Sequence, residues 1–256
     1  GFLEPTASSD QPLALGDPTV SGENFSPGEP VSPETVAQYL PAVGAAAPSI
    51  NQPLPEEVVL DNGLQILLLP TPGMSTVTID GWVNAGDRFD PEDKPGTAAL
   101  TALNLINGTQ SKDALALALS VESQGIQFAA STDTEGVNFS VNMLSEDLAF
   151  GTETLSDILR NSIFPADQLA LTQQQLASQL AATQSDPQGL SGRLFQQTVY
   201  PEGHPAHLLA TPESVISVAQ DDVKTFYDTY YRPDGTVITL VGDFDAAEVR
   251  SLLTET

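Results

Sequence analysis

Residues 58–69 read VVLDNGLQILLL and predict the first structural unit of the chain, two short strands joined by a tight turn. An Asn-Gly pair between apolar runs is a strong hairpin signal, because both Asn62 and Gly63 tolerate positive φ. Beyond this hairpin, apolar and polar residues alternate in further segments, which is typical of half-buried strands. These predicted strands cover residues 76–83, 126–131, 136–143 and 236–242.

Helical spacing of apolar residues separates these strands. The predicted helices cover residues 96–106, 113–123, 145–160, 165–186, 189–200 and 221–231. A further helix is expected to start at Thr211-Pro212, where an N-cap residue precedes a proline at the first helical position, and a last one starts at 245. This order of elements predicts an α+β fold, in which helices pack on one face of a largely antiparallel mixed sheet. We expect Trp82 to pack in the core, and Arg232 and Asp234 to form a buried ion pair or a loop anchor.

The composition excludes several classes of function. The 256 residues include 34 acidic and 8 basic side chains, for a formal charge of -26. Such a chain is repelled by nucleic-acid backbones and anionic membrane surfaces. It has no cysteine, which excludes disulfides and thiolate sites, and only His204 and His207 as imidazoles. No run approaches the roughly 18 apolar residues of a membrane span.

The chain changes in composition near residue 54. Residues 1–54 hold nine of the twenty prolines and six acidic residues but no basic one, which predicts an acidic tail or linker with one helical turn near 33–39. Residues 55–256 form the predicted domain, and their 28 acidic and 8 basic residues give it a charge of -20. The Gly1 start, the proline-rich tail and the lack of cysteine suggest export to a periplasm, a lumen or the outside.

Seven short motifs in this domain occur in a familiar order. They are LDNGL (60–64), WVNAGDR (82–88), Pro95-Gly96 through Gly108-Thr109, Phe164-Pro165, Tyr200 to His204-Pro205, YYRPD (230–234) and VGDF (241–244). Together they resemble the N-terminal half of the pitrilysin/insulinase family of zinc metallopeptidases, which includes the processing peptidases. The resemblance covers residues 55–256 and implies the fold of that half.

The family carries its inverted zinc motif, His-x-x-Glu-His, on the helix between the two glycines. The resemblance places the first histidine at Ala99, the general-base glutamate at Ala102 and the second histidine at Leu103. The third ligand, a glutamate on the next long helix, falls at Gln179. Alanine and leucine cannot bind zinc, and neutral glutamine is a poor substitute for a carboxylate. The sequence therefore predicts no metal site, no cofactor and no catalytic residue.

Other residues give weaker signals for chemistry. His204 and His207 lie three residues apart, but two histidines without a third ligand or a base favour loop or capping roles. Acidic pairs such as Asp221-Asp222 stand at the starts of predicted elements, where they complement helix dipoles. The glycines do not have the spacing of a phosphate-binding loop. No nucleophile and base pair is recognisable either.

The resemblance to this family, combined with the predicted loss of the zinc ligands, suggests two functions for the chain. In the first, the chain is the non-catalytic partner of a subunit with the intact zinc motif, and it shapes a chamber for extended peptides that bind through a sheet edge. In the second, it is a scaffold subunit of a larger complex, including a membrane-associated one, as inactive relatives are in respiratory complexes. Peptidase activity is expected only with a catalytic partner.

Overall fold

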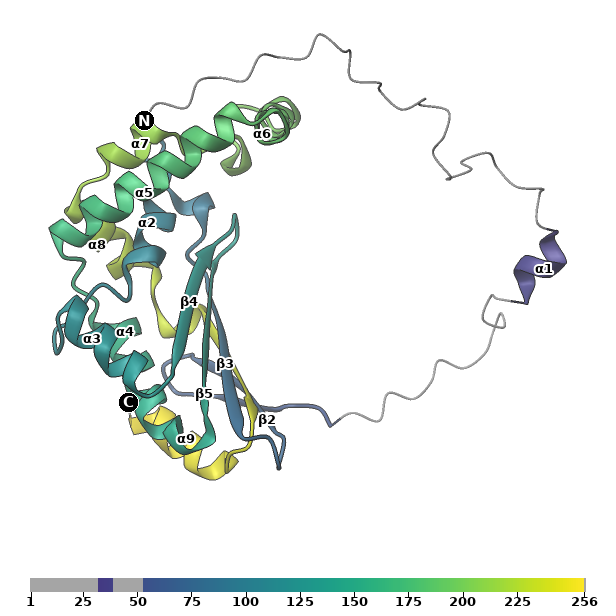
Figure 1. Ribbon diagram of the computed structural model, residues 1–256, viewed down its shortest axis with the longest axis vertical. Coiled ribbons are helices and arrows are strands. Elements are labelled where there is room, and N and C mark those ends of the chain that lie inside the picture. Colours follow the sequence, from purple (N-terminus) through teal and green to yellow (C-terminus); the bar gives the residue numbers. More distant parts are fainter. Residues whose placement is uncertain (1–31, 39–52, 256) are drawn as a thin grey trace, which may run out of the picture. The chain divides into compact units, whose positions relative to one another are not determined.

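The computed structural model describes residues 32–38 and 53–255 (Figure 1). The chain divides into two units, Gly1–Asn51 and Gln52–Thr256. In the first unit, the helical turn expected near residue 33 is present as α1 (Pro33–Ala37), which Ser32 caps by accepting a hydrogen bond from the backbone N–H of Thr35 (3.2 Å). The rest of the predicted tail, apart from residues 53 and 54, lies outside the described residues.

The described part of the second unit contains a six-stranded sheet. Its strands are β1 (Glu56–Val59), β2 (Gln65–Pro70), β3 (Thr76–Val83), β4 (Gln127–Thr132), β5 (Val137–Leu144) and β6 (Thr236–Gly242). They are ordered β1-β2-β6-β3-β5-β4. Strand β6 is parallel to β2 and antiparallel to β3, and the other neighbouring pairs are antiparallel. The predicted mixed, largely antiparallel sheet is confirmed, with β4 at one edge.

The first hairpin forms as predicted, but its turn differs from the expected one. Leu60 and Leu64 close a three-residue loop, in which the N–H of Leu60 donates to the carbonyl of Leu64 (2.9 Å). Gly63 has a φ of 89°, whereas Asn62 keeps a negative φ and instead accepts the N–H of Leu64 with its side chain (3.1 Å). Only Gly63 uses the positive φ that both turn residues tolerate, because a three-residue loop needs the left-handed region only at its last position.

The helices lie along one face of the sheet, as predicted (Figure 1). They are α2 (Thr97–Asn104), α3 (Ala114–Ser123), α4 (Leu148–Asn161), α5 (Ala166–Ser185), α6 (Pro187–Val199), α7 (Pro212–Ser217), α8 (Gln220–Tyr230) and α9 (Ala246–Glu255). None of the helices in the described ranges is long and apolar enough to cross a membrane.

Helix α2 takes part in both hydrophobic clusters of the domain. Ala98 and Ala102 pack with the inner face of the sheet, which includes Ile79 and Leu240. Leu100, on the same helix, belongs to a second cluster formed mainly between helices. Helix α2, which resembles the zinc-motif helix of the family, is thus packed on two sides. This packing fixes the direction in which its exposed side points.

Trp82 does not lie in this core. Its neighbour Val83 points toward the helices and is 1% exposed, so Trp82 projects from the opposite face of the sheet and is half-buried there. It packs over Gly136, where an added Cβ would lie 2.2 Å from the indole Nε1. The expectation of a core tryptophan is wrong because side chains alternate along a strand, and Trp82 is out of phase with the buried positions.

Candidate functional site

The N-terminus of α2 is held by a carboxylate that precedes it in the sequence. Asp90 accepts hydrogen bonds from the backbone N–H groups of Gly96 (2.6 Å) and Ala98 (2.7 Å). Gly96 has a φ of 101°, and a Cβ there would lie 2.8 Å from Cγ2 of Val215. Only glycine fits this left-handed position and the close approach of α7. The start of α2 is therefore fixed by one glycine and one acidic side chain.

Burial makes this carboxylate unusual. Desolvation raises the pKa of Asp90 to about 7, although the two N–H donors oppose the shift, and the nearby charge of Asp87 adds to it. Burial likewise raises the pKa of Asp87 to about 6, against a hydrogen bond from Thr132 and with a further rise from Asp133. Both groups titrate well above an ordinary aspartate. Sequence reasoning missed them because the loop between Phe89 and Gly96 must fold back before Asp90 can reach the helix.

The C-terminal turn of α2 is tied to α5 by buried polar groups. Asn104 is fully buried; its amide N–H donates to the carbonyl of Leu100 (2.8 Å). Its side-chain oxygen accepts from the hydroxyl of Thr172 on α5 (3.2 Å) and from the amide of Asn107 (2.9 Å). A satisfied buried network of this kind fixes the relative position of two helices.

The four positions of the zinc motif do not share one environment. Ala102 is 1% exposed and packs with the sheet, whereas Leu103 is 41% exposed. Ala99 is half-buried on α2, and Gln179 is exposed on α5. Leu103 and Gln179 line the same small cavity, so the structure brings together the positions predicted for the second and third ligands.

This α2–α5 cavity has a volume of about 330 Å³. Its walls carry amides, one hydroxyl and leucines: Leu103, Asn107, Gln168, Leu171, Thr172, Gln175, Leu176 and Gln179. Zinc sites in proteins use imidazole, thiolate and carboxylate ligands, and the cavity offers none of these. The donor set therefore does not fit the metal of the zinc peptidases. Its amides suit hydrogen bonding to a peptide backbone, which presents the same amide groups.

Both histidines have structural roles in the loop after α6. The Nδ1 of His204 accepts the backbone N–H of Ala206 (3.1 Å), and its ring stacks on Tyr200 at a centroid distance of 4.6 Å. The Nδ1 of His207 lies 2.8 Å from the carbonyl oxygen of Tyr200. The structure thus gives both imidazoles loop contacts of the predicted kind. Within residues 32–38 and 53–255, no three His, Asp or Glu side chains gather as a metal site would require.

Arg232 and Asp234 form the expected ion pair, but it is not buried. The Nε of Arg232 lies 3.1 Å from the carboxylate of Asp234, and the two side chains are 63% and 59% exposed. A pair so exposed adds little stability. The backbone carbonyl of Arg232 has the more definite role, since it accepts the hydroxyl of Thr236 at the start of β6 (2.7 Å).

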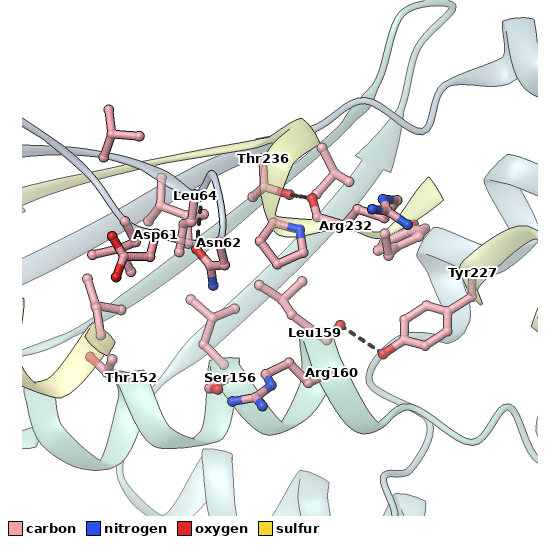
Figure 2. A pocket seen from close by; sticks show the side chains of 18 of the residues that line it. Asp61, Asn62, Leu64, Thr152, Ser156, Leu159, Arg160, Tyr227, Arg232 and Thr236 are labelled. Atoms are coloured by element: carbon pink, nitrogen blue, oxygen red, sulfur yellow. Dashed lines mark hydrogen bonds between the residues drawn. The ribbon is translucent and has the colours of Figure 1, made fainter. Parts of the chain in front are cut away.

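A second and larger cavity, of about 890 Å³, lies between the first hairpin, β6 and helices α4, α8 and α9 (Figure 2). Leu155 and Leu159 are among its apolar walls. Two of its lining hydroxyls, those of Thr152 and Tyr231, are buried without a hydrogen-bond partner. Beside them, Tyr227 donates its hydroxyl to the carbonyl of Leu159 (2.8 Å).

Nothing in the sequence indicated this cavity, because its walls come from segments far apart in the chain. Burial raises the pKa of Tyr227 to about 12 and raises that of Tyr231 further. Both phenols therefore stay protonated at neutral pH; that of Tyr227 donates to Leu159, whereas that of Tyr231 has no partner among the described residues. The cavity is also lined by Asp61, Arg160, Asp228 and Arg232, so its walls combine apolar, hydroxyl and charged side chains but offer no imidazole or thiol.

Comparison with known proteins agrees with this fold. Residues 65–213 match the sequence model of insulinase (peptidase family M16), and residues 217–256 match that of the peptidase M16 inactive domain. The first match alone covers more than half of the chain. The chain therefore belongs to the insulinase family of peptidases, and the resemblance inferred from the seven motifs is confirmed.

Relatives of known sequence include zinc proteases and processing peptidases. A zinc protease of Rickettsia felis, described as uncharacterized, is 26% identical over 195 residues, which are 75% of this chain and 47% of that protein. The beta subunit of the mitochondrial-processing peptidase of Rattus norvegicus is 26% identical over 200 residues, 77% of this chain and 41% of the subunit. The chain thus spans less than half the length of these two relatives.

Solved structures show the same fold. A Pseudomonas fluorescens protein described as a peptidase M16 inactive domain has a TM-score of 0.73 at 22% identity, over 78% of this chain and 49% of that one. Pitrilysin gives 0.72 at 18% identity, over 81% of this chain and 23% of that one. A chain of complex III from Candida albicans gives 0.64 at 19% identity, over 78% and 46%. The fold therefore occurs both in proteases and in a large assembly.

Proposed function

We propose that this chain is a non-catalytic member of the insulinase family that shapes a peptide-binding chamber together with a separate, catalytic subunit. The observation that carries the proposal is that Leu103 and Gln179, at the predicted ligand positions, line the same α2–α5 cavity. The fold keeps α2 and α5 together, yet the residues at the ligand positions are apolar or neutral. With Ala102 at the general-base position, the chain also lacks a group to activate water.

The same region supports peptide binding. Strand β4 is an edge of the sheet and pairs with β5 on one side, and it packs next to α2. An edge strand presents unpaired backbone groups to which an extended peptide can add as a further strand. The amides of Gln175 and Gln179 line the neighbouring cavity. Together these groups would bind a peptide through its backbone rather than through charged side chains.

The test is reconstitution with a catalytic partner. The purified chain is incubated with zinc and an unstructured peptide, alone or with the subunit of the same organism that has an intact His-x-x-Glu-His motif. We expect no cleavage by the chain alone and faster cleavage by the mixture than by the partner alone. Hydrogen exchange at β4 should slow when peptide is added. Cleavage by the chain alone that a chelator abolishes would contradict the proposal.

The alternative is a scaffold role, which the similarity to a complex III chain favours. A scaffold needs the fold but neither metal nor peptide binding. In that case the chain would co-purify with a membrane complex, and β4 would show no protection by peptide. Heteromeric assembly is common to both proposals.

Compartment and domain boundaries also belong to the proposal. We infer an exported protein whose residues 1–54 act as an acidic linker ahead of the domain at 55–256. One structural neighbour, PqqL of Escherichia coli, is a periplasmic protease, with a TM-score of 0.71 at 18% identity over 82% of this chain and 24% of that one. Fractionation of the source cells, followed by immunoblotting of the chain, would test the compartment.

A further inference from the structure

Helix α6 turns its polar side toward its own domain. The guanidinium of Arg193 donates to the carbonyl of Ala210 (2.9 Å), and the amide of Gln196 donates to the carbonyl of Ala206 (2.8 Å). Arg193 and Gln196 are three residues apart and so share a face of the helix. None of the residues of α6 is buried. The helix is therefore attached to the domain by hydrogen bonds rather than by an apolar face.

The apolar side chains of α6 point to solvent instead. Leu190, Leu194, Phe195 and Val199 are 43%, 55%, 70% and 53% exposed. In a surface helix, the hydrophobic stripe normally faces the core of its own domain. A helix of this length is also marginally stable without tertiary packing of an apolar face. This reversed arrangement is typical of a helix whose apolar face is covered by another protein.

The charge distribution singles out the same region. Residues 168–201, which include most of α5 and all of α6, contain one acidic and one basic residue, while the chain as a whole carries a charge of -26. Depletion of charge with exposed aromatic and aliphatic side chains is the composition of an interface core. One acidic residue stands at each end of the helix, Asp186 as its N-cap and Glu202 just beyond its last residue.

We propose that the exposed face of α6, formed by Leu190, Leu194, Phe195 and Val199, is the docking surface for a different protein subunit. The partner surface would be apolar at its centre and basic where it meets Asp186 and Glu202. The net charge favours a different subunit over a second copy of this chain. Two chains that each carry a charge of -26 repel each other everywhere except along residues 168–201, which have no net charge. The inference rests on the proposed function, for which the partner is the subunit with the intact zinc motif.

The test measures binding of the full chain to that purified zinc-motif subunit by calorimetry. The variant Leu194→Ser/Phe195→Ser removes two exposed apolar side chains from α6. The matched control is Leu115→Ser/Leu119→Ser on α3, where the leucines are 69% and 57% exposed. We expect the α6 variant to raise the Kd at least about 30-fold, as loss of interface anchors does, and the α3 control to change it less than about 3-fold. Circular dichroism would check that both variants keep the wild-type fold.

A second variant tests the charge of the partner. Asp186→Asn/Glu202→Gln keeps the side-chain oxygen that caps α6 but removes both charges. We expect a Kd about 3- to 10-fold higher at low salt and a weaker dependence on salt, because rim charges mainly steer association.

The outcomes separate this inference from the proposed function. If the wild type binds and the α6 variant binds equally well, the docking surface is wrong and the partner role stands. If the wild type does not bind the zinc-motif subunit, the proposed function fails, and the docking surface fails with it. If light scattering shows a dimer of this chain that the α6 variant abolishes, the occupant is a second copy, which overturns the choice of a different subunit.

Discussion

Helices α2 and α6 both expose leucines, but the domain holds them in opposite ways. Helix α2 buries Leu100 and Ala102 on its two core-facing sides, and its exposed Leu103 occupies the position predicted for a zinc ligand. Helix α6 buries nothing and is attached to the domain through Arg193 and Gln196. Substitutions on α2 should therefore change the stability of the chain itself. Substitutions on the outer face of α6 should change its assembly.

The largest difference between the helices should come from a matched pair of truncations. Leu100→Ala leaves a cavity at a fully buried site of α2, so we expect the free energy of unfolding to fall by about 3 kcal/mol. Leu194→Ala removes the same atoms from an exposed site of α6, and we expect a change within about 0.5 kcal/mol. Urea denaturation of both variants would measure the two values. Equal losses would mean that α6 is packed within its own domain.

The start of α2 gives the next largest effect. Gly96→Ala places a Cβ at a positive φ and against Val215, so we expect a loss of about 2 kcal/mol in the free energy of unfolding. Gly73 also has a positive φ but no atom within 4 Å of an added Cβ. Gly73→Ala therefore measures the backbone cost alone and should be about 1 kcal/mol. If the two variants lost equal stability, the close contact between α2 and α7 would not matter.

The third largest effect on stability should come from the hydrogen bonds between α2 and α5. Asn104→Ala removes the acceptor of the Asn107 amide and leaves the hydroxyl of Thr172 with only the carbonyl of Gln168, so we expect a loss of about 1.5 kcal/mol. Asn142 accepts a similar hydrogen bond from Thr78 on the exposed face of the sheet (2.8 Å). Asn142→Ala should cost less than about 0.5 kcal/mol, because water replaces an exposed partner. Thermal unfolding of both variants would compare them.

The last prediction concerns how stability changes with pH, and it is a slope rather than a single loss. Because the pKa of Asp90 is raised to about 7 in the folded chain, the folded state binds more protons than the unfolded state between about pH 4 and 7. Stability from this group is present at low pH and is lost as pH rises toward 7, by at most about 1.4 kcal/mol per pH unit. We expect Asp90→Asn to flatten this dependence. Its control, Asp93→Asn at an exposed position, should leave the dependence unchanged.

Much of the fold could be predicted from the sequence because its signals are local. The strands 76–83 and 236–242 agree with β3 and β6, and Thr211 before Pro212 marks the start of α7 as expected. The position of β6 between β2 and β3 could not be predicted from local signals, because strand pairing depends on contacts between residues far apart in the chain. The side of the sheet on which Trp82 lies was missed although the signal is local, since Trp82 is out of phase with the buried Val77, Ile79 and Val83.

The candidate site was only partly accessible to sequence reasoning. The resemblance placed the second and third ligand positions at Leu103 and Gln179, and these residues do line one cavity. The acidic cap at Asp90 and the larger cavity with Thr152 and Tyr231 depend on folded loops and on segments brought together in space. The reversed orientation of α6 was also hidden, since helical spacing is the same whichever face points inward.

The central claim is that the helices of the zinc site remain while the ligands are lost, and metal content tests it most directly. Elemental analysis would measure zinc in the full chain after expression with excess zinc and extensive dialysis. The positive control is Ala99→His/Leu103→His/Gln179→Glu, which restores three ligands at half-buried or exposed positions and leaves buried Ala102 unchanged. We expect far less than one zinc per wild-type chain and about one per control chain. One tightly held zinc per wild-type chain would contradict it.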